Sequence, residues 1–281
     1  MNENEKSRAR DAQLLRDLDA DDSARMLAAI DSITIGTGQR PLPEPVLTAL
    51  VRCVGDTRKS VQRRAIDALA ALSAAGDSRV VENLRRSVAG ADRRARWAAA
   101  YALSQIGADN LARDITDSVC EALSDDDGDV RWAAANILVR LGREDPAMGK
   151  RLLALAGDAD SNARKMALYC IRDLDIRGPD LLDALTRLVR DPDVHVRLAV
   201  LSVLARLENS GASDDPAATL ALQALESDPD AGVRRAAAAA LGNRKSATLR
   251  AAAALRATAR DKSDQSLARA AQNALDRLEK R

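Results

Sequence analysis

Apolar residues recur along the chain at a spacing that predicts pairs of α-helices. Seven segments align without internal gaps, and their starting residues, 33 to 37 positions apart, are Val61, Ala95, Val130, Ala163, Val196, Val233 and Leu267. Apolar residues occupy offsets 0, 4, 7, 8 and 11 from each start, with Arg244 as the exception at offset 11. These offsets form one stripe of an α-helix. A period of this length indicates stacked helical units.

Aspartates predict where these helices begin. Three residues before the start of each segment, with Arg58 as the exception in the first, stand Asp92, Asp127, Asp160, Asp193, Asp230 and Asp264. An aspartate there accepts hydrogen bonds from exposed backbone N–H groups and typically contributes about 0.5–2 kcal/mol. A second set of amphipathic segments lies at residues 44–54, 79–88, 112–123, 146–156, 179–189, 216–225 and 246–259. About seven helix pairs are therefore expected, with second helices beginning near residues 58, 92, 127, 160, 193, 230 and 264.

The ends of the chain depart from this phase. Residues 11–35 are apolar-periodic but out of register, and residues 36–45, with three prolines, form a turn after them. We therefore expect residues 1–43 to be an N-terminal tail with capping helices, and residues 44–281 to be the repeat array. Residues 209–216 are a lengthened linker between the fifth and sixth pairs.

Composition supports an all-α fold. The 281-residue chain contains 57 alanines, four aromatic residues and no phenylalanine. Alanine is the best helix former, whereas β-sheets are rich in β-branched and aromatic residues. The small side chains also favour thin helices packed closely in layers.

The repeat resembles a known family. The recurring pattern Asp-x-x-Val-Arg-x-x-Ala-x-x-x-Leu, complete in residues 127–138, is similar to the short HEAT-like repeat of the phycobilisome-lyase type. The resemblance implies a right-handed α-solenoid whose second helices line the concave face. Such repeats occur in scaffolds, bilin lyases, a hydroxylase and DNA-repair glycosylases, so the resemblance bears on fold more than on function.

Candidate catalytic and metal sites are scarce. The single histidine, His195, has no His-Glu pair around it, which separates the chain from the HEAT-like hydroxylases. The aspartates of residues 125–129 lack the spacing and terminal glutamate of a calcium loop, so helix capping explains them better. Cys53, Cys120 and Cys170 lie far apart in apolar-periodic segments and are expected to be buried free thiols. We expect no catalytic residue, metal or cofactor.

The chain also has no stretch that approaches 18 consecutive apolar residues, and its charged start resembles neither a signal peptide nor a transit peptide. These features favour a cytoplasmic protein with no membrane partner.

One arginine per central repeat follows the starting residue, at Arg96, Arg131, Arg164, Arg197 and Arg234. This ladder has two explanations, a basic binding surface or a structural role. Its place beside the apolar stripe favours the structural role, in which each arginine bonds an aspartate or a carbonyl of an adjacent repeat.

The four aromatic residues occupy the opposite face of the second helices. Trp97 and Trp132 lie at offset 2, and Tyr101 and Tyr169 lie at offset 6. Offsets 2, 6 and 9 point about 140° or more away from the centre of the apolar stripe on a 100° helical wheel. We therefore expect these residues to be exposed.

Two explanations of these aromatics stay open, packing between adjacent helices or a binding patch. Binding is favoured, because aromatic residues beside arginine or lysine are typical anchors of interaction sites. The predicted cationic patch comprises Trp97, Tyr101, Trp132, Asn136, Lys165, Tyr169 and Arg172.

The sequence thus predicts a non-catalytic scaffold that binds a protein or peptide, including one with acidic groups. A nucleic-acid-binding protein similar to DNA-repair glycosylases is the alternative, although a formal net charge of +1 lacks the basic excess typical of that class. A bilin-lyase-like subunit has no support beyond the resemblance. The partner and the oligomeric state are left open.

Overall fold

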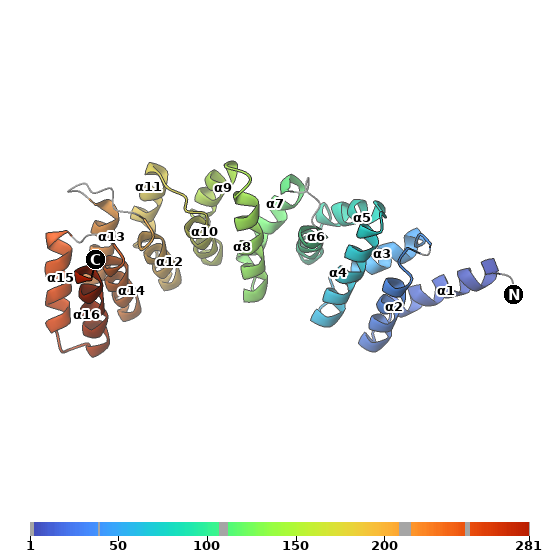
Figure 1. Ribbon diagram of the computed structural model, residues 1–281, viewed down its shortest axis with the longest axis horizontal. Helices are drawn as coiled ribbons and strands as arrows, with labels where there is room; N and C mark the ends of the chain where they lie inside the picture. Colours follow the sequence, from blue (N-terminus) through green and yellow to red (C-terminus); the bar gives the residue numbers. More distant parts are fainter. Residues whose placement is uncertain (1–2, 39, 107–111, 208–214, 245–247, 281) are drawn as a thin grey trace. The chain divides into compact units, whose positions relative to one another are not determined.

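The expected all-α fold is confirmed by a computed structural model, which describes residues 3–38, 40–106, 112–207, 215–244 and 248–280 (Figure 1). This part of the chain forms sixteen α-helices and one short 3-10 helix, with no β-strand. The chain divides into two compact units, Met1–Ala122 and Leu123–Arg281. The predicted boundary between a cap and the repeats, at residues 43 and 44, stays a prediction.

Unit 1 contains seven helices in two layers. They are α1 (Glu3–Leu18), α2 (Ser23–Ile35), α3 (Glu44–Cys53), α4 (Lys59–Ala74), α5 (Arg79–Val88), α6 (Arg93–Ile106) and α7 (Ala112–Glu121). Helices α1, α3, α5 and α7 contact one another in order, and so do α2, α4 and α6. The pairs α1 and α2, α3 and α4, and α5 and α6 join the two layers.

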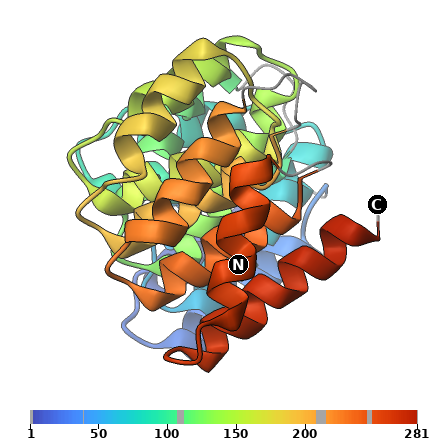
Figure 2. The same cartoon turned by 90° about the vertical axis from the view of Figure 1, so that its left-hand side faces the viewer.

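Unit 2 repeats this arrangement after a short 3-10 helix, Ala122–Ser124, at the unit boundary. Its first helices are α9 (Ala147–Leu155), α11 (Pro179–Leu188), α13 (Pro216–Ser227) and α15 (Leu249–Arg260). Its second helices are α8 (Gly128–Gly142), α10 (Ser161–Asp173), α12 (Val194–Leu204), α14 (Ala231–Gly242) and α16 (Gln265–Glu279). The second helices contact one another in sequence order, and Figure 2 shows the closely packed C-terminal helices in orange and red. Unit 2 is therefore also a two-layered helical stack.

Aspartates cap the second helices of unit 2 at their N-termini. The carboxylate of Asp193 accepts hydrogen bonds from the N–H groups of His195 and Val196, at 2.7 and 3.2 Å. The capping carboxylates of α8, α10, α14 and α16 belong to Asp127, Asp160, Asp230 and Asp264. In unit 1, α4 follows Arg58 and has no side-chain cap. Local hydrogen bonding therefore sets where these helices begin.

Small residues allow the second helices to approach closely. A Cβ atom added to Gly242 in α14 would lie only 2.6 Å from the Cα of Ala274 in α16. The core is aliphatic, with fully buried side chains such as Leu138 and Leu168. Cys53 and Cys170 are buried free thiols as expected, but Cys120 is only half-buried. Burial raises the pKa of the Cys53 thiol to about 11, so this thiol stays protonated at neutral pH.

The arginine that breaks the apolar stripe is buried in unit 2. Arg244 forms a two-pronged ion pair with Asp215, with Nε–Oδ2 and Nη2–Oδ1 distances of 2.6 and 2.8 Å. Its Nη1 also donates to the carbonyl of Leu204 at 3.2 Å. The pair thus joins the ends of α12 and α14 to the start of α13. Most of the predicted 209–216 linker lies outside the described residues.

Candidate functional site

The two aromatic rings of unit 2 are stacked on each other, and one of them is about half exposed to solvent. Trp132 on α8 and Tyr169 on α10 lie with ring centroids 5.3 Å apart and planes 13° from parallel. The guanidinium carbon of Arg172 lies 4.9 Å from the Tyr169 ring centroid. Even so, 49% of Trp132 is exposed. The stack therefore holds a large apolar ring in place and leaves about half of its surface open to a ligand.

The side-chain amide of Asn136 lies near this ring and is open to a hydrogen-bond partner. Asn136 follows Trp132 by one helical turn and is exposed. It forms no hydrogen bond with any other described residue. Its side chain can donate two hydrogen bonds and accept others, so it suits a backbone amide of a bound chain.

Lys165 contributes a positive charge one turn before Tyr169. Its Nζ donates a hydrogen bond to Oδ1 of Asn162 at 2.9 Å, and it has no ion pair with a described residue. Burial lowers the pKa of the Lys165 ammonium, and Arg131 lowers this pKa further, against the opposite effects of Asp193 and Asp160. A bound anion would offset this charge repulsion, so Lys165 is the cation of the patch best suited to meet a ligand.

Arg172 does not add a free positive charge. It forms an ion pair with Asp173, with Nε–Oδ1 and Nη2–Oδ2 distances of 2.7 and 3.1 Å. The Arg172 guanidinium holds the pKa of Asp173 below its usual range. Arg172 is therefore paired with a neighbouring carboxylate while it stacks on Tyr169, and its part in a cationic patch stays a prediction.

The aromatic pair of unit 1 is different. Trp97 on α6 is 8% exposed and Tyr101 is half-buried, with ring centroids 5.6 Å apart and planes tilted by 40°. The expectation that Trp97 is exposed is wrong. Helix α6 is contacted by α4, α5 and α7, and Tyr101 lies against the indole. We therefore build the candidate site on the five residues of unit 2 alone, namely Trp132, Asn136, Lys165, Tyr169 and Arg172.

The ladder arginines bond the turns between helices. The Nη1 of Arg197 donates to the carbonyl of Asp191 at 2.9 Å, and its Nε and Nη2 donate to the carboxylate of Asp228 at 2.7 and 3.1 Å. The guanidinium of Arg164 donates to the Asp191 carboxylate at 2.8 Å through both Nε and Nη2. Carbonyl contacts of the same kind involve Arg96, Arg131 and Arg234. These contacts occupy the guanidinium groups within the protein.

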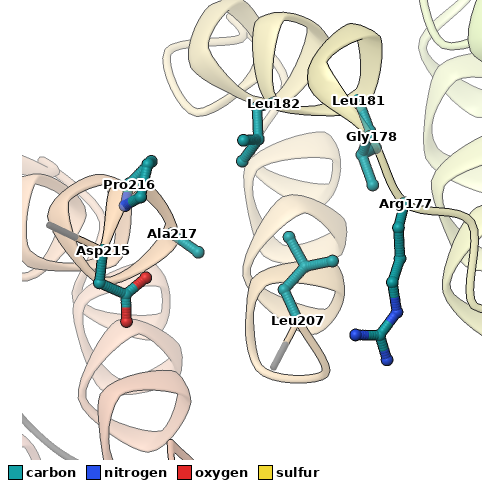
Figure 3. A pocket seen from close by; sticks show the side chains of 8 residues that line it. All are labelled: Arg177, Gly178, Leu181, Leu182, Leu207, Asp215, Pro216 and Ala217. Atoms are coloured by element: carbon teal, nitrogen blue, oxygen red, sulfur yellow. The ribbon is translucent and has the colours of Figure 1, made fainter. Parts of the chain in front are cut away.

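Unit 2 also has an open hollow of about 200 Å³ (Figure 3). Leu181, Leu182 and Leu207 contribute apolar side chains, and Arg177 and Asp215 contribute charge. Both charges are engaged, because Arg177 pairs with Asp175 at 2.9 Å and Asp215 pairs with Arg244. No periodicity in the sequence indicates this hollow, since its lining comes from a turn, a helix end and a linker.

The described ranges contain neither a candidate metal-binding cluster nor a helix that could cross a membrane. Those residues include no cluster of three or more histidine, cysteine, aspartate or glutamate side chains suited to a metal ion. None of the described helices combines the length and hydropathy that crossing a membrane requires.

Comparison with known proteins agrees with the architecture. Residues 149–217 match the family model for HEAT repeats. Within residues 149–217 the chain is therefore similar to HEAT-repeat proteins. The phycobilisome-lyase subtype and the handedness of the solenoid stay predictions. No curated protein sequence matches this chain.

Solved structures share the fold at low sequence identity. YibA of Escherichia coli is 16% identical with a TM-score of 0.57, over 100% of this chain and 93% of YibA. The karyopherin Kap121p is 16% identical with a TM-score of 0.66, over 94% of this chain and 33% of Kap121p. Importin beta is 16% identical with a TM-score of 0.60, over 95% of this chain and 40% of importin beta. The chain thus spans about a third of the length of Kap121p, and these likenesses concern the helical solenoid fold alone.

Proposed function

We propose that this protein is a non-catalytic scaffold that binds a protein or peptide on the second-helix face of unit 2. The observation that supports this proposal is the half-exposed Trp132 ring, which Tyr169 already holds in a stacked position. Binding sites concentrate their free energy in a few large anchors, and tryptophan is enriched among them. A ring that is already ordered loses little conformational entropy when a ligand covers it.

The groups around Trp132 complement an extended peptide. Asn136 offers an amide that can pair with a peptide bond, and Lys165 offers a cation for a carboxylate. Together they provide apolar, hydrogen-bonding and charged contacts on two adjacent helices, α8 and α10. A partner with an apolar side chain next to an acidic one fits this combination.

The structural neighbours offer an analogy at the level of the fold. Kap121p structures include one bound to Pho4p and one bound to the extreme C-terminus of the protein phosphatase Cdc14p. A helical solenoid of this kind is therefore able to present a surface for protein segments. The residues that would bind in our protein are its own, and the proposal rests on them.

A peptide selection tests the proposal. A displayed library of random 16-residue peptides is panned against the full chain, against Trp132→Ala and against Leu249→Ala. Leu249 is the matched control because it is 93% exposed on α15, away from the Trp132 stack. We expect peptides to be enriched on the wild type and on Leu249→Ala, and to be lost on Trp132→Ala.

Circular dichroism of each variant keeps a binding defect separate from unfolding. Enrichment that is equal on all three proteins would refute the role of Trp132. No enrichment on the wild type would contradict peptide binding itself.

A further inference from the structure

A row of equivalent positions continues from Trp132 across all five second helices of unit 2. At offset 2, each helix contributes one residue: Trp132, Lys165, Leu198, Arg235 and Arg269. The five helices contact one another in the same order, α8, α10, α12, α14 and α16. The row therefore begins with an aromatic residue and ends with two arginines.

These two arginines are available to a ligand. Arg269 is exposed and Arg235 is half-exposed, and neither forms a hydrogen bond or ion pair with another described residue. One turn further along the same helices stand the uncharged Ala239 and Asn273, and Arg235 also interacts electrostatically with the Asp230 carboxylate without forming an ion pair with it. In contrast, the ladder arginines are occupied by turn carbonyls and carboxylates. Residues 231–281 contain 12 lysines and arginines against 4 aspartates and glutamates, so this part of the sequence carries an excess of positive charge.

We infer that the ligand of this face is an acidic linear peptide with two separated contacts, an apolar residue on Trp132 and carboxylates on Arg235 and Arg269. This inference rests on the proposed function and adds the class of ligand and its spacing. The guanidinium group pairs with a carboxylate through two parallel hydrogen bonds, which makes arginine a selective partner for an acidic side chain.

Helix packing sets the required spacing. Neighbouring helix axes lie about 8–10 Å apart, so α8 and α14 are separated by three steps, or roughly 24–30 Å. An extended peptide covers about 3.3 Å per residue, so about seven to nine residues separate the apolar anchor from the carboxylate that meets Arg235. The carboxylate for Arg269 follows one helix later, about ten to twelve residues from the anchor.

The same row is less suited to nucleic acid. Single-stranded nucleic acids are held by phosphate contacts combined with stacking of successive bases on aromatic rings. Both aromatic residues of unit 2 lie at the α8 and α10 end, and α12, α14 and α16 contain none. The arginines therefore have no stacking platform beside them, which favours carboxylates as their ligands.

The test begins with the composition of peptides selected on the wild type. We expect aspartate or glutamate to be enriched about seven to twelve residues from an apolar residue. The best peptide is then synthesised with a fluorescent label, and its affinity is measured by anisotropy for Arg235→Glu/Arg269→Glu and for the matched control Arg256→Glu/Arg260→Glu. The control reverses two exposed arginines of α15 and changes the net charge by the same amount. We expect a loss of about tenfold or more for the first protein and less than about twofold for the control.

A second measurement tests the spacing. The selected peptide is shortened by four residues between its apolar anchor and its acidic group. We expect this deletion to weaken binding to the wild-type protein about as much as the charge reversal weakens binding of the full peptide. Equal losses in both charge-reversed proteins, or an affinity that does not depend on the spacer, would overturn the inference.

The outcomes also separate this inference from the proposed function. If peptides depend on Trp132 but bind Arg235→Glu/Arg269→Glu unchanged, only the two-contact inference fails. If no peptide is enriched, the proposed function fails and the inference with it. If a labelled single-stranded 20-nucleotide DNA binds the wild type and not this variant, while the selected peptide is unaffected, the row is a nucleic-acid contact and the inference is wrong.

Discussion

The buried ion pair between Arg244 and Asp215 provides a sharp test of the energetics of unit 2. The side chains of these residues are 2% and 4% exposed. At the position of Arg244, the other six repeats have leucine or isoleucine. We predict that each single replacement, Arg244→Leu or Asp215→Asn, destabilises the protein strongly, whereas the double replacement is far milder than the two combined.

The magnitudes follow from what each change leaves behind. Among the described residues, Arg244→Leu leaves the Asp215 carboxylate buried with the Ala218 N–H, at 3.0 Å, as a hydrogen-bond donor. Asp215→Asn leaves a buried guanidinium facing the Leu204 carbonyl. Removing one partner of a buried pair costs about 3–5 kcal/mol, whereas replacing both by uncharged groups is often nearly neutral. Because asparagine also caps helices well, the double variant retains the start of α13. We therefore expect a coupling free energy of at least about 2 kcal/mol.

The assay is a double-mutant cycle in urea, followed by far-ultraviolet circular dichroism. Hydrogen exchange of the backbone amides of α13 and α14 measures the local free energy of opening, and it does not require the array to unfold in one step. If the two single effects add up to the effect of the double variant, the two residues do not act as a unit and the reasoning is refuted.

Three further predictions concern other parts of the molecule. Trp97→Ala, a change in a buried ring, should cost about 3–5 kcal/mol, whereas half-exposed Trp132→Ala should cost less than about 1 kcal/mol; equal shifts in melting temperature would contradict this. Arg197→Lys should lower the free energy of unfolding by about 1–3 kcal/mol, because lysine cannot keep both contacts with Asp228, and an unchanged urea midpoint would be inconsistent with that role. The hydrogen bond from the Val233 N–H holds the pKa of Asp230 below its ordinary value, so the unfolded state binds the proton more readily than the folded state. The contribution of Asp230 to the free energy of unfolding is therefore present above about pH 4. It is lost as the pH falls through the lowered pKa of the folded state. Asp230→Asn should flatten the acid limb of an unfolding titration, and an identical pH profile for the variant would refute this assignment.

Periodicity predicts the helices of this protein well, for a physical reason. Each repeat buries one apolar stripe, and an aspartate begins most second helices, so a short stretch of sequence contains the information. The two tryptophans show where this information ends. Trp97 and Trp132 share the same offset, yet one is 8% and the other 49% exposed. A helical wheel gives the direction of a side chain from its own axis, but the neighbouring helices decide whether that direction is open.

Charged residues also differ in whether the sequence alone can identify their role. Arg235 and Arg269 can be found from their offset, because they share it with Trp132 and Lys165. The partner of Arg244 cannot, since Asp215 lies 29 residues earlier at the start of α13 and follows no period. Interactions between equivalent positions are thus accessible from a repeating sequence, whereas those that involve a linker require the structure.

The ladder has a consequence for how such a chain can change its length. In unit 2, the Asp191 carbonyl accepts from Arg197 of its own helix pair, and its carboxylate accepts from Arg164 of the preceding pair. Likewise, the Asp228 carbonyl accepts from Arg234 of its own helix pair, and the Asp228 carboxylate accepts from Arg197 of the preceding pair. The pair formed by α11 and α12 therefore presents an acceptor, Asp191, at one junction and a donor, Arg197, at the other. Duplicating or deleting this pair as one complete period rejoins a matching donor and acceptor, so the chain can gain or lose a repeat at this point without leaving either carboxylate unpaired.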